Sequence, residues 1–120
     1  MRAEARRPGR GRIGVAVLAL AAVLGTAGLP WAALASAVVE VAQKNRTFAV
    51  REAEVAPGTI LHFTNEDDFP HQIHVTGPGL DIDSPLQNSG QAVDITFPAA
   101  GTFEVRCGIH PRMRMSVHVQ

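Results

Sequence analysis

The sequence contains no tyrosine and only one cysteine and one tryptophan among its 120 residues. A single cysteine excludes an internal disulfide, so Cys107 must pair with another chain, remain a buried thiol or bind a ligand. After residue 38 no apolar pattern with the helical period appears, which argues against a helical domain. A basic stripe is absent too. From residue 38 onward the sequence contains six basic and ten acidic side chains, which gives a net charge of about −4. This charge argues against a general nucleic-acid binder.

The first 37 residues differ in composition from the rest. Five arginines precede a stretch from Ile13 to Val39 that carries no charged side chain and contains Pro30 followed by small residues. Ala35-Ser36-Ala37 matches the small-x-small pattern at which signal peptides are cleaved. We therefore predict a secretory signal over residues 1–37, a mature domain over residues 38–120, and a location in the periplasm or at another extracytoplasmic face. The uncharged stretch would also suffice for a retained membrane anchor, since a span needs roughly 20 apolar residues.

The remainder of the chain consists of short runs in which apolar and polar residues alternate. Turn residues separate these runs, which is typical of an all-β sandwich or barrel. The pattern predicts strands at residues 39–42, 48–55, 59–65, 71–76, 93–97, 102–107 and 113–119. Residues 77–90 are rich in Gly, Pro, Asp, Asn and Ser, and are predicted to form a long loop. One all-β domain is therefore expected.

Strand alternation also predicts which reactive side chains face the interior. Cys107, His71 and Met113 all fall on inward faces, and His110 lies in the short loop between the last two strands. A thiolate, two imidazoles and a weak axial thioether are the ligand set of a blue copper centre. The Cys-x2-His-x2-Met motif at residues 107–113, together with the upstream Pro70-His71, therefore predicts a copper site.

Two ligand positions have rivals in the sequence. Met115 would take the axial position if the ligand loop were longer, and Met113 would then only fill space in the core. His74 competes with His71, but it falls on the opposite strand face. Cys107 itself could be a buried free thiol, which is a common fate of cysteine.

Other polar residues are predicted to have structural roles. The run from Glu66 to Asp68 would suit a hard cation, although a turn between two strands explains it equally well. The remaining histidines are predicted to be solvated surface residues on outward faces: His62, His74 and His118.

The sequence resembles the cupredoxins, the family of type I (blue) copper proteins, and within them the amicyanin group most closely, with plastocyanin and pseudoazurin as further relatives. The motifs that carry this resemblance are Pro57-Gly58-Thr59, Asn65-x4-Pro70-His71 and Gly101-Thr102-Phe103-x3-Cys107-x2-His110-x2-Met113. Two positions depart from the family pattern. Gln72 stands where Asn is frequent, and Phe103 stands where Tyr is common.

The resemblance implies a small Greek-key β-barrel or sandwich that holds one type I copper. By the same resemblance His71, Cys107 and His110 would be equatorial ligands and Met113 the axial one. It further implies a monomeric, non-enzymatic electron carrier, with a quinone-cofactor amine dehydrogenase as donor and a c-type cytochrome as acceptor.

Three classes of function compete for such a site. The leading hypothesis is an electron shuttle outside the cytoplasm. A copper-delivery protein is the alternative, although such proteins favour several Met or Cys ligands in an open site. A copper enzyme would need further copper ions held by histidine, and the three remaining histidines are predicted to point outward and apart. Zinc could occupy the same ligands and would give a colourless, redox-inactive protein.

Overall fold

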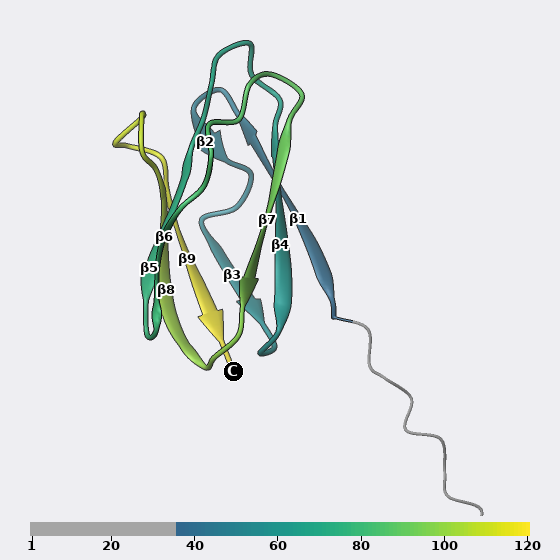
Figure 1. Cartoon of the computed structure of the whole chain (residues 1–120), viewed down its shortest axis with the longest axis vertical. Helices are drawn as coiled ribbons and strands as arrows, with labels where there is room; N and C mark the ends of the chain where they lie inside the picture. Colours follow the sequence, from purple (N-terminus) through teal and green to yellow (C-terminus); the bar gives the residue numbers. More distant parts are fainter. Residues whose placement is uncertain (1–35) are drawn as a thin grey trace, which may run out of the picture. The chain divides into compact units, whose positions relative to one another are not determined.

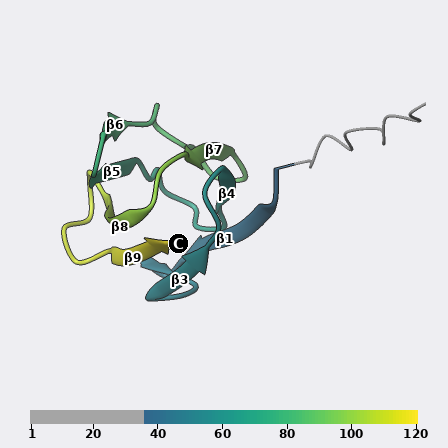
Figure 2. The same cartoon turned by 90° about the horizontal axis from the view of Figure 1, so that it is seen from below.

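The computed structural model describes residues 36–120, so the predicted signal over residues 1–37 lies almost entirely outside the described part. Within residues 36–120 the chain forms nine strands and no helix, hence no helix long and apolar enough to cross a membrane. The predicted all-β class is confirmed. The strands form two mixed sheets that enclose a common core, as the two perpendicular views show (Figures 1 and 2).

Each sheet combines segments that are distant in sequence. One sheet has the order β2 (Thr47–Phe48), β1 (Val38–Lys44), β4 (Thr59–Asn65) and β7 (Ala92–Phe97). The other has the order β3 (Glu52–Val55), β9 (Arg114–Val119), β8 (Gly101–Cys107), β5 (Ile73–Gly77) and β6 (Leu80–Asp83). The pairs β1–β4 and β3–β9 are parallel and the others antiparallel. The chain therefore crosses repeatedly between the sheets, as the predicted Greek-key sandwich requires.

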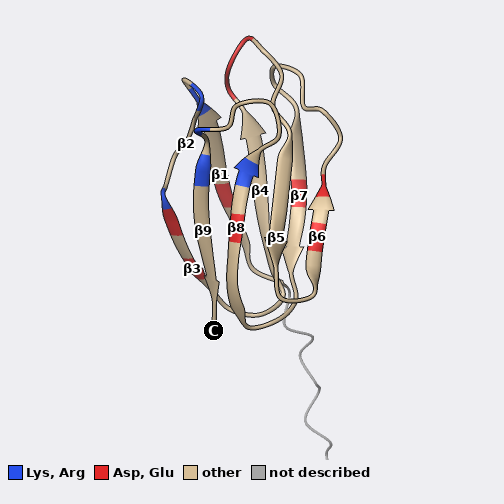
Figure 3. Ribbon diagram, turned by 90° about the vertical axis from the view of Figure 1, so that its left-hand side faces the viewer, with Lys and Arg blue, Asp and Glu red and all other residues tan. Residues whose placement is uncertain are grey.

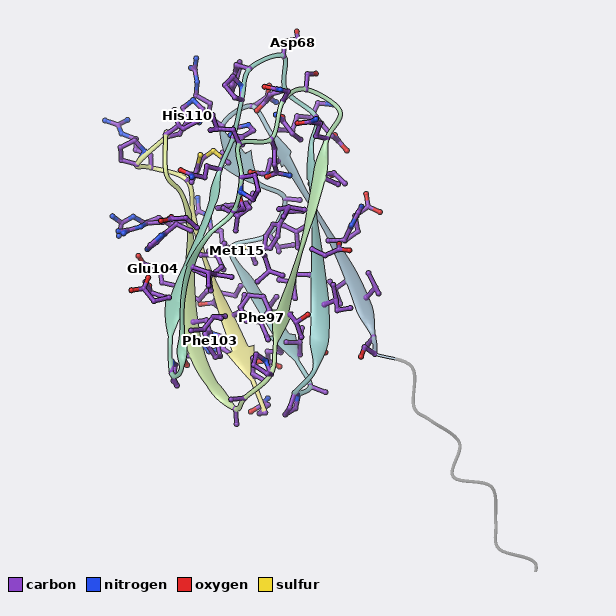
Figure 4. The ribbon with its side chains drawn as sticks, in the orientation of Figure 1. Asp68, Phe97, Phe103, Glu104, His110 and Met115 are labelled. Atoms are coloured by element: carbon purple, nitrogen blue, oxygen red, sulfur yellow. The ribbon has the colours of Figure 1, made fainter. Side chains whose placement is uncertain are left out.

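The core follows from strand alternation. In β4 every second residue is buried, and the same holds for most of β8. Phe63, Phe97 and Phe103 are fully buried, and the rings of Phe97 and Phe103 meet edge to face with centroids 5.3 Å apart. Figure 4 places both rings in the half of the sandwich away from His110. Burial of each such side chain contributes about 1.5–3 kcal/mol to the stability of the fold. Much of the apolar stabilisation therefore comes from the half of the sandwich away from His110.

The predicted long loop at residues 77–90 is wrong in its first half, which forms β6. The register pairs Gly77 with Leu80, so Pro78 and Gly79 make a two-residue turn between β5 and β6. Gly79 has a φ of 69°, which glycine adopts without steric cost. Leu80 and Ile82 pack against the core. The sequence pattern failed here because turn residues and aspartates dominate the composition, while the apolar alternation spans only four residues.

The predicted strand at residues 48–55 is also wrong as a single element. The structure divides it into β2, which pairs with β1, and β3, which pairs with β9 in the other sheet.

The strand predicted from His71 begins only at Ile73, because His71 forms an isolated bridge with Gln87 instead of continuing the sheet.

We predict that Gly77→Ala destabilises the fold by about 1–3 kcal/mol, the usual cost of overpacking a core. A methyl group at Gly77 would overlap the ring of Phe103. Urea unfolding of the single variant, of Phe103→Leu and of the double variant measures this. The cost of the alanine should be smaller when Phe103→Leu is also present, because a leucine side chain can move away. An equal cost in both backgrounds would contradict the steric explanation.

Candidate metal centre

Three donor atoms converge at the end of the sandwich opposite the C-terminus. The Nδ1 atoms of His71 and His110 lie 3.2 Å apart, and the Sγ of Cys107 lies 3.7 and 3.5 Å from them, respectively. His71 and Cys107 are buried, whereas His110 is partly exposed at the surface of this end (Figure 4). Within residues 36–120 this is the one group of three potential metal donors. It contains three of the four residues predicted as ligands.

These distances fit a single metal ion. Metal–donor bonds of about 2.0–2.3 Å with angles of about 110–120° place neighbouring donors roughly 3.3–3.8 Å apart. The donor triangle has sides of 3.2–3.7 Å. One thiolate and two imidazoles suit copper in both oxidation states. The residues present therefore fit a type I copper ion.

The loop between β8 and β9 brings two of the donors together. Cys107 is the last residue of β8, and its N–H donates to the carbonyl of Met113 at 3.1 Å. The N–H of Met113 donates in turn to the carbonyl of His110 at 3.0 Å. These bonds fold the loop so that His110 returns over Cys107.

The ring of His71 is oriented by Asp67. The Nε2 of His71 donates to the Oδ2 of Asp67 at 2.8 Å, and both side chains are almost fully buried. Because Nε2 carries the proton, the lone pair of Nδ1 is free for a metal. Burial alone would raise the pKa of Asp67, but the hydrogen bonds from His71 and from the N–H groups of Arg46 and Asn45 outweigh it, so its pKa is lowered. The carboxylate therefore stays charged beside the imidazole.

Sequence reasoning missed the role of Asp67, which it placed within a polar loop or a possible cation site. The structure instead uses this side chain to accept hydrogen bonds from Asn45, Arg46 and His71. Glu66 pairs with Lys44, and no cluster of donors for a hard cation forms within residues 36–120. The sequence offered a signal for this role, because Asp67 stands only four residues before His71. A histidine that binds a metal usually donates its other N–H to a carboxylate or a carbonyl.

Buried amides hold the backbone of His71. His71 and Gln87 exchange two backbone hydrogen bonds, of 3.0 and 2.8 Å. The side chain of Gln87 donates to the carbonyl of Phe63 at 2.9 Å and accepts from Gln43 at 3.0 Å. Asn65 donates to the carbonyl of Gln87 at 2.9 Å. Because His71 lies outside the regular sheet, these bonds fix it to β1 and β4.

Gln72 links the two segments that carry the buried donors. Its backbone N–H points at the Sγ of Cys107 at 3.5 Å, and its carbonyl accepts from the N–H of Gly108 at 3.1 Å. The side chain donates to the carbonyl of Ser84 at 3.0 Å and also packs closely against Gly108, where a β-carbon would overlap it. With Gln in place of the frequent Asn, the backbone of this residue still joins the two segments.

Phe69 covers both imidazoles. Its ring lies edge-on to those of His71 and His110, with centroids 5.4 Å from each. The guanidinium of Arg46 lies over the same ring, 4.8 Å from its centroid, within the range of a cation–π contact. Burial is the main cause that lowers the pKa of His110, and the positive charge of Arg46 adds to it. A lowered pKa keeps this imidazole neutral, the form that binds a metal.

The position of Met115 favours Met113 as the axial residue. Met115 pairs with Val105 of β8, two residues before Cys107, and so lies about 7 Å farther into the sandwich. Figure 4 shows it in the interior, well away from His110. Met113 is buried and lies in the ligand loop itself.

The remaining histidines face outward, as the alternation predicts. Each bonds to a partner on a neighbouring strand, in the pairs His62–Asp94, His74–Asp83 and Thr102–His118. The description of His74 as a solvated residue is wrong, because its side chain is only 15% exposed. It lies beside Asp83 and Asp81, and not with Cys107 and His110.

Comparison with known proteins shows the family to which this chain belongs. The family model for copper binding proteins of the plastocyanin/azurin family matches residues 35–120. The chain belongs to this family. Amicyanin-alpha of Methylorubrum extorquens is 32% identical to this copper protein over 111 residues, which cover 85% of this chain and 93% of the relative. Copper is therefore the metal of this protein, and the predicted resemblance to the cupredoxins, amicyanin among them, is confirmed.

Solved structures support the same assignment. A reduced mutant of amicyanin superposes on this copper protein with a TM-score of 0.65 at 27% identity, covering 74% of this chain and 88% of the other. A copper-containing nitrite reductase from Thermus scotoductus superposes with a TM-score of 0.66 at 26% identity. That match covers 78% of this chain but only 24% of the reductase. The fold thus occurs both in small copper proteins and as a part of a larger enzyme.

We predict that Asp67→Asn weakens copper binding about 10- to 100-fold, as the loss of a hydrogen-bond partner of a metal-binding histidine typically does. The amide has one oxygen in place of two and cannot accept from all three present donors. Competition with a chelator measures the affinity. Asp68→Asn is the matched control, because it removes the same charge at the exposed tip of the same loop (Figure 4). Equal losses in both variants would contradict an orienting role for Asp67.

Proposed function

We propose that this protein is a type I copper electron carrier that acts outside the cytoplasm. His71, Cys107 and His110 bind the copper equatorially, and Met113 is the weak axial ligand. The observation that carries the proposal is the donor triangle of one buried thiolate and two imidazoles. Copper bound there would accept one electron from a donor and pass it to an acceptor.

Hydrogen bonds within the protein hold the donors in place. Asp67 holds the ring of His71, backbone bonds to Gln87 hold its main chain, and the backbone of Gln72 lies against the sulfur of Cys107. A site that is held rigidly and suits both oxidation states reorganises little when the charge changes. Small reorganisation is what rapid electron transfer requires.

His110 is the route by which we propose that electrons leave. Its ring is partly exposed, whereas His71 and Cys107 are enclosed. Ile109, 42% exposed, and Pro111 flank it at the surface. A small apolar surface of this kind suits brief contact with a redox partner, because small interfaces dissociate quickly.

The partners that we propose rest on the similarity to the amicyanins. The similarity to amicyanins supports a quinone-cofactor amine dehydrogenase as electron donor and a c-type cytochrome as acceptor, with the protein acting as a monomer. The basic, apolar and small-residue stretches of residues 1–37 support export to the periplasm.

The alternatives have less support. A nitrite reductase or a multicopper oxidase needs further copper ions held mainly by histidine, and within residues 36–120 no second group of three donors exists. A copper-delivery protein is favoured by an accessible site, whereas Cys107 is only 2% exposed. Both observations favour a carrier over an enzyme or a delivery protein.

We predict an intense absorption band toward the red end of the visible spectrum for the Cu(II)-loaded protein. The band arises from charge transfer between the thiolate and Cu(II), so ascorbate should bleach it and Cys107→Ser should abolish it. Visible absorption before and after ascorbate is the measurement. A pale spectrum, or a band that survives Cys107→Ser, would refute the proposed site.

We predict different effects from the two methionines of the last strand region. Met113→Leu should raise the reduction potential, because loss of a thioether donor disfavours the more highly charged oxidised state. Met115→Leu should leave the potential unchanged and cost less than about 1.5 kcal/mol of stability. Voltammetry and urea unfolding of both variants measure this. A potential that responds to Met115→Leu and not to Met113→Leu would make Met115 the axial ligand.

A further inference from the structure

An arginine-lined groove runs from His110 along one side of the molecule. Its first part, about 550 Å³, is lined by Arg46, Thr47, Ile109, His110, Pro111 and Arg112. A second part of about 480 Å³ shares Thr47 and Arg112 with the first, and adds Arg51, Arg114 and one carboxylate, Glu104. Four guanidinium groups thus line a continuous groove that begins at the exposed copper ligand.

Most of these charges are unbalanced. Arg114 pairs with Glu104 and donates to the carbonyl of Pro111. Within residues 36–120, no carboxylate lies within ion-pair distance of Arg46, Arg51 or Arg112. All three side chains are exposed. The groove therefore carries positive charge although residues 38–120 have a net charge of about −4.

The strands at the opposite edge of the molecule carry acidic side chains and no basic ones. β6 and β7 contain Asp81, Asp83 and Asp94 and no basic residue. Figure 3 shows the Lys and Arg positions on the side of β8, β9 and the β2–β3 segment, toward the end that carries His110. A partner with a charged surface would thus meet this end in one orientation.

The turn that carries Arg46 supports a functional role for this residue. Asn45 and Arg46 form a two-residue turn between β1 and β2, and both have positive φ, 55° and 57°. Turns of this kind strongly prefer glycine at the second position, because a side chain there is strained. Asp67 accepts the N–H groups of both residues and so stabilises the turn. A residue that breaks a local preference in this way is typical of functional sites.

We infer that this groove, defined by Arg46, Arg51, Arg112 and Arg114, is the docking site for an acidic surface of a redox protein. Carboxylates of the partner bind the guanidinium groups, while its apolar centre contacts Ile109 and Pro111 beside His110. Guanidinium groups bind carboxylates well because two N–H groups match two oxygens. This inference rests on the proposed electron-carrier function, and it specifies the side of His110 on which the partner binds.

The first test does not depend on redox activity. Poly-L-glutamate is titrated into the ¹⁵N-labelled full chain, and amide shifts are followed by NMR at low and high salt. We expect salt-sensitive shifts at Arg46, Thr47 and Arg112, and none along β6. Shifts that omit the groove, or that Arg46→Gln and Arg112→Gln leave unchanged, would overturn the docking site even if the protein proves to be a blue copper carrier.

The second test measures electron transfer at the groove. Stopped-flow absorption follows the Cu(I) protein as it loses one electron to hexacyanoferrate(III), which becomes hexacyanoferrate(II). At an ionic strength of about 0.1 M, Arg46→Gln and Arg112→Gln should each slow this reaction about three- to tenfold, because steering of an anion depends on local charge. The cationic oxidant tris(phenanthroline)cobalt(III) should not be slowed.

Gln120→Glu is the matched control for net charge. It lowers the charge by one, as each arginine variant does, but at the C-terminus, at the end of the sandwich away from His110 (Figures 1 and 4). Its rate with hexacyanoferrate(III) should stay within about twofold of the wild type, since exposed charges more than about 10 Å apart are largely screened. If Gln120→Glu slows the reaction as much as Arg112→Gln, net charge explains the effect and the groove is not a docking site. Absence of the blue band would instead refute the proposed function.

Discussion

The geometry of the metal centre depends on one buried carboxylate. Asp67 accepts hydrogen bonds from the ring of His71 and from the backbone of Asn45 and Arg46, which lie in a different part of the chain. A buried charge is unfavourable unless hydrogen bonds satisfy it, and these three donors do so. Because one carboxylate binds both the imidazole and the strained turn, the orientation of His71 and the position of Arg46 above Phe69 are set together.

The two ends of the sandwich are stabilised by different kinds of interaction. Aromatic residues such as Phe97 and Phe103 fill the half away from the metal and supply apolar burial. In the other half, polar side chains, among them Asn65 and Gln87, hold the segment that carries His71. A domain of this size buries only somewhat more than about 60% of its unfolded surface, so its margin of stability is small. Copper binding to the folded state adds to that margin.

Much of the fold and most of the donor set could be predicted from the sequence. Strand alternation placed Cys107 and His71 on inward faces, and the motif identified His110, because these features depend on neighbouring residues only. β6 was missed because its turn residues outweigh four residues of alternation. The division of residues 48–55 between two sheets was also missed, since strand pairing depends on partners distant in sequence.

The sequence by itself determined which chemical groups are available and which strand face each occupies, because a period of two residues is a local property of an extended chain. Only the tertiary structure decided which nitrogen of His71 faces Cys107 and His110, because the hydrogen bond of the other nitrogen to Asp67 depends on how the loop before His71 folds. It also decided that Gln43 and Gln87 form a hydrogen bond, and that arginines from two separate loops line one groove beside His110. These arrangements arise from contacts between distant segments, and no local pattern of residues encodes them.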